Sequence, residues 1–444
     1  MRGTQSVNDK GHLMIGAVDT VALAKTYGTP LYVYDVALIR EKAQAFKKAF
    51  ADYPAQYQIA YASKAFSSVA MIQLVEELDL ALDVVSGGEL YTALAAEFPP
   101  EKIHFHGNNK SVDELRYAVR EGIGAIIVDN FYELAMLEQV AAEESRQVRI
   151  LLRLTPGVQT NTHAYIATGQ EDSKFGFYFT NGDAFKAVEN ALDSPWLRLE
   201  GVHFHLGSQL FDPKTYIHAI QRLYKEMDQW HDQLNFIPKI VNVGGGFGIP
   251  YTDEDQEVTP AVFIEAITQT IMDECGARSL SLPEIWIEPG RVLVGEAGTT
   301  LYTLGSQKTT AGGRTYISVD GGMSDNLRPA LYQSKYEAAL AAAIQEPPVS
   351  TVTLAGKCCE SGDIVIQDID LPNCQSGDVL AVFCTGAYGY AMANNYNRLP
   401  RPAVVFVEAG DACLVVERET YQDLIHHDLP LGKKVISKSV DTDC

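Results

Sequence analysis

The chain has 444 residues, of which 46% are hydrophobic, and a formal net charge of −22 with a pI near 4.8. This acidic balance argues against nucleic acid or an anionic membrane as a partner. No apolar run reaches the roughly 18 residues of a membrane span, and the opening MRGTQSVNDK lacks the apolar segment of a signal peptide. We therefore expect a soluble protein of the cytoplasm.

Cysteine and histidine spacing gives no sign of a disulfide framework or a metal site. The seven cysteines are scattered and form no CxxC pair: Cys275, Cys358, Cys359, Cys374, Cys384, Cys413 and Cys444. Such an odd set in a long chain is typical of reduced thiols. The pairs His104/His106 and His203/His205 each share a strand face, but no third ligand stands at a familiar spacing. We expect no bound metal.

From about residue 31 to 290, short apolar runs alternate with helical stretches. The strand candidates in chain order are LYVYD, YQIAYA, LDVVS, IHFHG, AIIVD, VRILLRL, GVHFHLG and KIVNVGGG. Amphipathic stretches such as 110–121 and 131–144 predict helices between them. Eight such repeats favour a closed α/β barrel of the (β/α)8, TIM type.

Beyond Arg291 the sequence becomes rich in strands and turns. Runs such as TYISVDGG, DIVIQDIDLP, DVLAVFC and AVVFVEAGDACLVVERE predict antiparallel strands of a sandwich or partial barrel. The early run HLMIGAVD is also strand-like and precedes the barrel. We expect a barrel over 37–288 and a β domain over 289–444, with 1–36 contributing its N-terminal strand.

Lys64 closes the apolar run YQIAYA just before a helix begins. A lysine there is most often a solvated helix cap. At the C-terminal end of a first barrel strand, however, a desolvated lysine can form a Schiff base with a cofactor aldehyde. The fragment alone leaves both interpretations open.

The stretch VGGGFGIPY follows the expected eighth strand. Successive glycines expose backbone N–H groups, which suits a phosphate after a late barrel strand. A dinucleotide fingerprint would come early in a βαβ unit, with an acidic residue about 20 positions on. A flexible glycine turn is the other interpretation.

Two further motifs place reactive side chains in turns. In WIEPGR, Glu288 can hold a proton on a pyridine nitrogen and Arg291 can bind a carboxylate, although a surface turn with an ion pair is the commoner case. In KCCESGD, a thiol stands beside Glu360 and could donate a proton, although a buried cysteine is the commoner fate.

Lys64, HFHLGSQ, GGGFG, EPGR, CESGD and GAYGYAMANNYN occur in this order over nearly the whole chain. With these motifs in this order, the sequence closely resembles the diaminopimelate decarboxylases, in the motif variants found in Firmicutes. These enzymes belong to the alanine racemase-like, fold-type III group that uses pyridoxal 5′-phosphate. Six chance matches in one order are improbable, so the resemblance favours the functional interpretation of each motif.

The resemblance implies a role for each residue around the cofactor. Lys64 would carry it as a Schiff base, His205 would stack on its ring, and Glu288 would keep the ring nitrogen protonated. Racemase relatives have an arginine at that nitrogen, so a carboxylate favours decarboxylation. The remaining cofactor contacts would come from Ser208, Gly245, Gly246, Gly248 and Tyr388.

The resemblance also implies a substrate site shared between two subunits. Arg291, Arg328 and Tyr332 would bind the distal carboxylate of meso-diaminopimelate, with Tyr388 also near the substrate. In a homodimer, Cys359 of the neighbouring chain would protonate the carbanion and Glu360 would bind the distal ammonium. Cys358 matches no functional position and is expected to be structural.

The resemblance thus implies decarboxylation of meso-diaminopimelate to L-lysine and CO2, the last step of lysine biosynthesis. A sibling decarboxylase for ornithine, arginine or carboxynorspermidine is the first alternative. CESGD argues against ornithine and arginine, because those relatives usually carry an aspartate after the cysteine. A non-catalytic cofactor-binding relative is the remote alternative, but it should have lost Lys64 or Cys359, and both are present.

Overall fold

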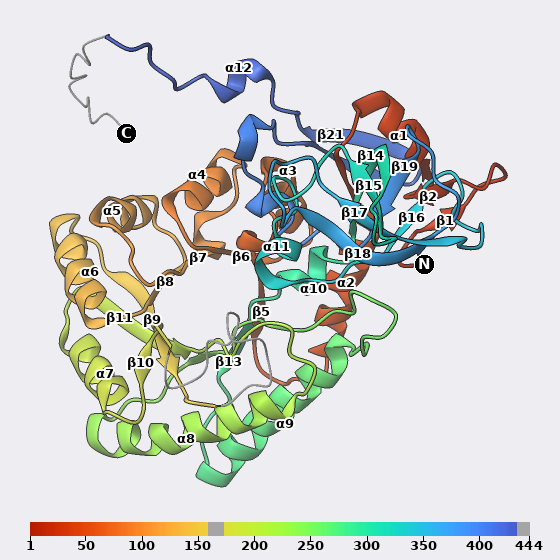
Figure 1. The fold of residues 1–444 in the computed structure, drawn as a ribbon. Helices are drawn as coiled ribbons and strands as arrows, with labels where there is room; N and C mark the ends of the chain where they lie inside the picture. The colour runs from red at the N-terminus through yellow and green to blue at the C-terminus, as the bar shows by residue number, and fades with distance from the viewer. Residues whose placement is uncertain (159–172, 433–444) are drawn as a thin grey trace.

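The computed structural model describes residues 1–158 and 173–432 and contains a closed barrel of parallel strands beside a second, mostly antiparallel sheet (Figure 1). Eight strands pair side by side in a ring: β5 (Tyr57–Ala62), β6 (Ala81–Val84), β7 (Ile103–Phe105), β8 (Ala125–Val128), β9 (Val148–Thr155), β11 (Leu197–His203), β12 (Ile240–Asn242) and β13 (Glu284–Ile287). Pairing of β13 with β5 and of β8 with β9 completes the circle. The expected TIM-type barrel is confirmed. A short strand, β10 (Phe177–Tyr178), adds to β9.

Amphipathic helices cover the outside of the barrel, as Figure 1 shows. They are α2 (Val36–Ala49), α3 (Val69–Glu77), α4 (Gly87–Ala95), α5 (Val112–Glu121), α6 (Phe131–Glu143), α7 (Asp183–Asp193), α8 (Lys214–Leu234) and α9 (Pro260–Arg278). The helix expected from residue 110 begins at Val112, because Ser111 forms a capping box with Glu114. Lys110 instead lies buried before the helix, with its ammonium 2.7 Å from Glu133.

The run at 31–35 stands among the eight strand candidates of the barrel, although it lies outside the expected barrel range of 37–288, and it is not a barrel strand. These residues form β4 (Leu31–Asp35), which pairs antiparallel with β14 (Gly298–Thr309) and parallel with β20 (Ala403–Glu408) in the second sheet. All five residues of β4 are buried, so its apolar pattern suits a central strand of either sheet. The eighth strand of the barrel is β13. The glycine loop, which is the stretch VGGGFGIPY at 243–251, therefore follows the seventh barrel strand, β12.

Seven strands of the second sheet lie side by side in the order β18-β17-β15-β14-β4-β20-β21. Its strands not yet introduced are β15 (Thr315–Val319), β17 (Ser350–Ala355), β18 (Ile364–Leu371) and β21 (Asp411–Val416), with β19 (Val379–Val382) and β16 (Ala338–Leu340) joined to the side of β14. All pairs are antiparallel except β4–β20 and β15–β17. A mostly antiparallel second sheet confirms the expected fold class, while the domain boundaries themselves stay a prediction.

Within residues 1–36, β4 is a strand of the large sheet, whereas the strands before it form a small separate sheet. It contains β1 (Ser6–Val7), β2 (Leu13–Ile15) and β3 (Val18–Asp19), followed by α1 (Thr20–Tyr27). Leu13 and Ile15 are buried in one apolar cluster with Val33 and Val405 of the large sheet. Three short helices complete the fold: α10 (Arg291–Val294), α11 (Arg328–Tyr332) and α12 (Tyr421–Leu424). Within residues 1–158 and 173–432, no helix is both long and apolar enough for a membrane span.

Candidate active site

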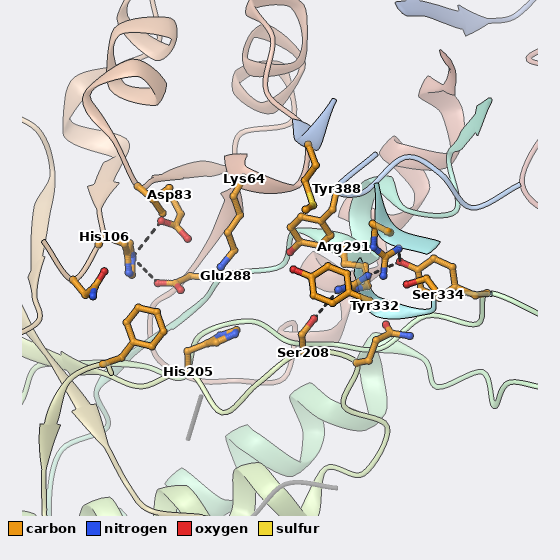
Figure 2. A pocket seen from close by; sticks show the side chains of 18 of the residues that line it. Lys64, Asp83, His106, His205, Ser208, Glu288, Arg291, Tyr332, Ser334 and Tyr388 are labelled. Carbon is orange, nitrogen blue, oxygen red and sulfur yellow. Dashed lines mark hydrogen bonds and ion pairs between the residues drawn. The ribbon is translucent and has the colours of Figure 1, made fainter. Parts of the chain in front are cut away.

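A cavity of about 710 Å³ lies at the C-terminal ends of the barrel strands and is closed by residues of the second sheet's connections. Lys64 stands at its wall, in the 3-10 turn Ser63–Ala65 that directly follows β5. Figure 2 shows the Lys64 side chain reaching toward Glu288, and His205 lies below both residues in this view. The first barrel strand therefore delivers a lysine into the cavity, at the place where barrels carry their chemistry.

Glu288 follows β13 and is buried at one end of the cavity. Its carboxylate accepts a hydrogen bond from the Asn242 amide at 2.5 Å, and Nε2 atoms of His106 and His203 lie 3.0 and 3.2 Å from its two oxygens. Burial lowers the pKa of His106 to about 4 and also lowers that of His203, so both rings are neutral at neutral pH. Burial alone would raise the pKa of Glu288, but the two imidazoles outweigh it and hold that pKa well below its usual range. Glu288 is therefore a buried anion.

Asp83 is a second carboxylate in the same wall, and the sequence motifs did not single it out. Its Oδ1 lies 3.4 Å from Nε2 of His106. Burial and then the charge of Glu288 raise the pKa of Asp83 well above its usual range. Two neighbouring carboxyl groups thus have opposite tendencies, one ionised and one protonated. The available signal was the polar residue inside the apolar run LDVV.

His205 and the glycine loop form the neighbouring wall. The N–H of Gly245 donates to Nδ1 of His205 at 3.3 Å, and the N–H of Gly244 donates to the Asn242 side chain. Burial, with Lys64 and Arg153 nearby, lowers the pKa of His205 well below its usual value. His205 is therefore a neutral ring whose Nε2 carries the proton, as the donation into Nδ1 requires.

The glycine loop is not an open row of free N–H groups, in contrast to the sequence-based expectation. Gly248 donates its N–H to the Leu210 carbonyl, while Gly245 and Gly244 are engaged as above. Gly246 lines the smaller cavity beside Lys64, at a φ of 105°. A side chain at Gly246 would stand 2.2 Å from the Gly207 carbonyl, so close packing of two loops requires glycine there.

At the far end of the cavity, two buried arginines meet at one hydroxyl. Arg291 donates to Ser208 Oγ at 2.8 Å and to the Tyr251 hydroxyl. Arg328 donates to the same Tyr251 hydroxyl and to Tyr336, each at 2.8 Å. Two cations held by neutral oxygens form an attractive site for an anion. Ser208 and Arg291 were expected on different ligands, yet here they are in contact.

Tyr332 and Tyr388 also line the cavity. The segment of Arg328 and Tyr332 is helical, and both of its ends line the cavity. Tyr388 donates its N–H to the Ala65 carbonyl, next to Lys64, and its ring lies 4.7 Å from the Arg291 guanidinium. Tyr388 of the β domain thus lies next to both Lys64 and Arg291.

Cys359 and Glu360 do not line the cavity of their own chain within the described residues. Both are exposed, and the N–H of Cys359 donates to the Asn397 side chain at 2.7 Å. Cys358 beside them is buried, and burial raises the pKa of its thiol to about 11. The exposed pair is available to another molecule, whereas Cys358 is held inside, as a structural residue would be.

Two of the histidines considered and set aside as metal ligands meet a third ligand-type residue in space. Atoms of His106, His203 and Glu288 lie within 4.8 Å of one another, all buried. The sequence spacing concealed this, because the three residues end different strands. The absence of a metal stays a prediction.

Three further lining residues were missed by the sequence motifs: Arg153, Phe175 and Tyr251. Arg153 lies near the C-terminal end of β9, and its guanidinium lies over the ring of Phe175 at 4.1 Å. Its position near the C-terminal end of a barrel strand was the available signal. Tyr251 lies beyond the glycine loop, where no periodicity predicts its direction.

This barrel, with a lysine after its first strand and a buried carboxylate after its last, defines a barrel-type decarboxylase that uses pyridoxal. Residues 36–295 match the family "Pyridoxal-dependent decarboxylase, pyridoxal binding domain". The chain is 60% identical to diaminopimelate decarboxylase of Bacillus subtilis, covering 97% of this chain and 98% of that one, and 57% identical to that of Halalkalibacterium halodurans, covering 98% and 99%. A crystal structure of diaminopimelate decarboxylase from M. jannaschii is 35% identical, with a TM-score of 0.88 over 96% of this chain and 98% of that one. The chain belongs to the diaminopimelate decarboxylase family.

The cofactor of this family model is pyridoxal phosphate, and the residues present fit it. Lys64 supplies an amine, and Glu288 supplies a buried anion that can pair with a protonated ring nitrogen. The Nε atom of Arg291 is buried without a hydrogen-bond partner, beside Ser208. A cationic donor with unused capacity next to a hydroxyl suits an anionic group of the cofactor or of the substrate.

Proposed function

We propose that the protein converts meso-2,6-diaminopimelate to L-lysine and CO2, the last step of lysine biosynthesis. One observation carries this proposal: a single cavity joins Lys64 and Glu288 at one end to Arg291 and Arg328 at the other. The first end suits pyridoxal chemistry, and the second suits a further carboxylate on the substrate. The sequence relatives named above support the same activity.

When bound, the cofactor supplies an electron sink for the electron pair released as the carbon–carbon bond breaks. Lys64 holds it covalently and His205 packs against its ring. Glu288 stays ionised and keeps the proton on the ring nitrogen, which preserves the sink. Ser208 and the loop residues Gly245, Gly246 and Gly248 form the phosphate end of the site, and Tyr388 contacts the cofactor. For Gly245 and Gly248 the contribution is to loop shape, because their N–H groups have partners.

Substrate choice follows from the cationic end of the cavity. Arg328 and Arg291 bind the distal carboxylate with help from Tyr332. A substrate without that carboxylate, such as ornithine or lysine, leaves buried guanidinium groups unpaired, and an unpaired buried charge costs about 3–5 kcal/mol. The site therefore selects a diamino acid with two carboxylates.

We further propose a cytoplasmic homodimer with shared active sites. Cys359 and Glu360 are exposed and outside their own cavity, which leaves them free to enter the cavity of a partner. There Cys359 donates the proton that replaces CO2, and Glu360 binds the distal ammonium. The six described cysteines are all unpaired, which suits a reducing compartment.

A substrate panel tests this function. The purified protein is incubated with cofactor and, separately, with meso-diaminopimelate, lysine, ornithine and arginine, and the release of CO2 is measured. Reactions without added enzyme serve as the control. We expect CO2 from meso-diaminopimelate alone. Comparable release from ornithine, arginine or lysine would assign the protein to a sibling activity, and release from none would contradict a decarboxylase.

A further inference from the structure

The first residues of the chain form hydrogen bonds where the barrel meets the second sheet. The N–H and hydroxyl of Thr4 both donate to one oxygen of Asp35, at 2.9 and 2.7 Å. The N–H of Arg2 donates to the Gln5 side chain at 3.0 Å. These contacts fix the local backbone, and the Arg2 side chain points inward with 19% of its surface exposed.

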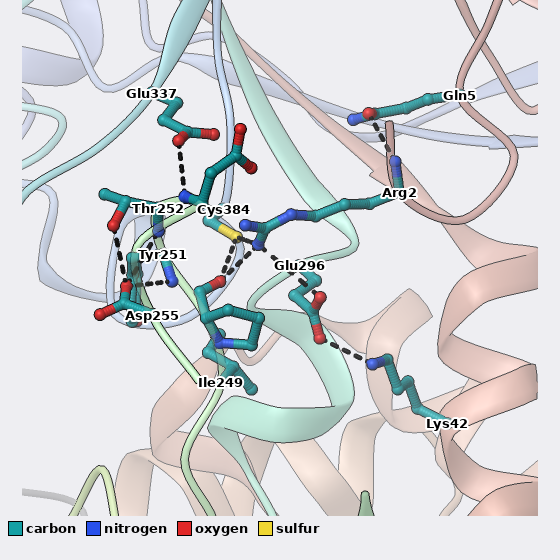
Figure 3. Close-up of polar contacts among 12 residues, drawn as sticks. Arg2, Gln5, Lys42, Ile249, Tyr251, Thr252, Asp255, Glu296, Glu337 and Cys384 are labelled. Carbon is teal, nitrogen blue, oxygen red and sulfur yellow. Dashed lines mark hydrogen bonds and ion pairs between the residues drawn. The ribbon is translucent and has the colours of Figure 1, made fainter. Parts of the chain in front are cut away.

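The Arg2 guanidinium contacts three segments that are far apart in the chain (Figure 3). It donates to the carbonyl oxygen of Pro250 and to the Cys384 thiol, and it lies 3.7 Å from the Glu296 carboxylate. The other oxygen of Glu296 pairs with Lys42 at 2.7 Å. Arg2 thus joins a barrel loop to the β domain, whereas Lys42 touches only the carboxylate.

Pro250 directly precedes Tyr251, the residue whose hydroxyl accepts hydrogen bonds from both cavity arginines. The carbonyl of Pro250 and the N–H of Tyr251 belong to one rigid peptide plane. Arg2 holds the oxygen of this plane, and Asp255 accepts from its N–H at 2.9 Å. On the other side of Pro250, the Gln209 side chain makes two hydrogen bonds with Ile249. The backbone direction at Tyr251 is therefore fixed on both sides of Pro250, and Arg2 contributes to it without lining the cavity itself.

We infer that Arg2 is a positioning residue for the carboxylate-binding end of the cavity. By holding the peptide plane before Tyr251, it keeps the tyrosine hydroxyl between the guanidinium groups of Arg291 and Arg328. If the Tyr251 hydroxyl moves away, the two guanidinium groups lose their common hydrogen-bond acceptor and repel each other. The inference deepens the proposed function and rests on it, because it assumes that these arginines bind the substrate carboxylate.

The variant Arg2→Met tests the inference, since methionine keeps an unbranched stem without hydrogen-bond donors. We expect the KM for meso-diaminopimelate to rise roughly fivefold, an effect smaller than loss of a direct charged contact, while kcat and cofactor absorbance change little. Lys42→Met is the matched control, because it removes the other cation on Glu296 without touching Pro250. It should leave KM unchanged. An unchanged KM in Arg2→Met, or an equal rise in Lys42→Met, overturns the inference.

A double-mutant cycle tests whether Tyr251 transmits the effect. Tyr251→Phe removes the shared hydroxyl, so adding Arg2→Met to it should raise KM by less than twofold further. A full fivefold rise in that background overturns the route through Tyr251.

Hydrogen exchange gives a readout that does not depend on activity. Amides of residues 251–255 should exchange faster in Arg2→Met than in Lys42→Met or the unmodified protein. Unchanged exchange there overturns the inference whatever the substrate proves to be. If the unmodified protein instead releases no CO2 from meso-diaminopimelate, the proposed function fails, and the exchange result still decides whether Arg2 holds the loop.

Discussion

Glu288 remains an anion in a buried place because two neutral imidazoles and an amide surround its carboxylate. Hydrogen bonds to an ionised group outweigh the cost of burial when several converge on it. Asp83, which also lies beside His106, has an oxygen without a hydrogen-bond partner, and burial together with the charge of Glu288 raises its pKa. At the residue scale, local donors rather than depth decide which carboxyl group can pair with a protonated ring nitrogen.

Glu288→Gln tests this assignment. Glutamine keeps the size but removes the charge that holds the ring proton, so kcat should fall by at least about 100-fold while the cofactor still binds through its phosphate end. Steady-state CO2 release and cofactor absorbance measure the two effects. Glu284→Gln, at the other end of the same strand, should be close to unmodified. Near-normal turnover in Glu288→Gln would show that the electron sink does not depend on this residue.

His104 lies in the barrel interior and gives a prediction about acid stability. Its ring stacks on Trp286 at 4.1 Å, and burial lowers its pKa to about 3. The usual pKa of histidine is about 6.5, so below that pH His104 binds a proton in the unfolded chain but not in the folded chain. The free energy of unfolding therefore falls by up to about 1.4 kcal/mol per pH unit from this residue as the pH falls toward 3. Urea unfolding of His104→Phe between pH 7 and 5 should show a shallower loss than the unmodified protein. Equal slopes would contradict the assignment.

At the scale of elements, strand order decides which residues meet. The run LYVYD and the run EIWI are both short, apolar and fully or nearly buried, so periodicity cannot tell which one enters the barrel. The choice depends on pairing with strands more than 200 residues away, such as β14 and β20. Barrel type and the lysine after the first barrel strand could be predicted, whereas the list of eight strand candidates included LYVYD and left out EIWI.

The same limit applies to the site. Lys64, Glu288 and Arg328 stand in recognisable motifs, and all three line one cavity. The contact of His106 with Glu288 joins two strand ends separated by 182 positions in the chain, and that of Tyr251 with Arg328 joins a loop to a helix 77 positions on. Neither contact leaves a local pattern in the sequence.

The short helix α11 carries the cationic end of the cavity, and Arg328→Ala tests it. Removing a partner of a charge-assisted contact costs about 2 kcal/mol or more, so KM for meso-diaminopimelate should rise at least about 30-fold while cofactor binding persists. Arg314→Ala, an exposed arginine outside the cavity, is the control. Unchanged kinetics in Arg328→Ala would place the carboxylate site elsewhere.

At the scale of the whole molecule, the cavity and the exposed pair Cys359 and Glu360 belong to different surfaces of one chain. In the proposed homodimer a second copy would bring the two together, and the β domain would then take part in catalysis beyond closing its own barrel. A homodimer with two shared sites is the simplest closed arrangement of this kind.

Mixing two inactive variants counts the shared sites. Lys64→Ala and Cys359→Ala proteins are combined under conditions that exchange subunits. Random pairing makes half of the dimers mixed, each with one live site of two, so CO2 release should recover to roughly 25% of the unmodified level. If each site lay within one chain, the mixture would stay at the level of its parents however long it was incubated.

The product balance of the reaction tests the central claim most directly. CO2 and L-lysine formed from meso-diaminopimelate are quantified together, for the unmodified protein and for Lys64→Ala, both with added cofactor. We expect one lysine for each CO2 and a loss of turnover of at least about 1,000-fold in Lys64→Ala, since the proposed function requires covalent attachment of the cofactor at this residue. Consumption of substrate without matching CO2 and lysine, or turnover retained without Lys64, would contradict a lysine-centred decarboxylase.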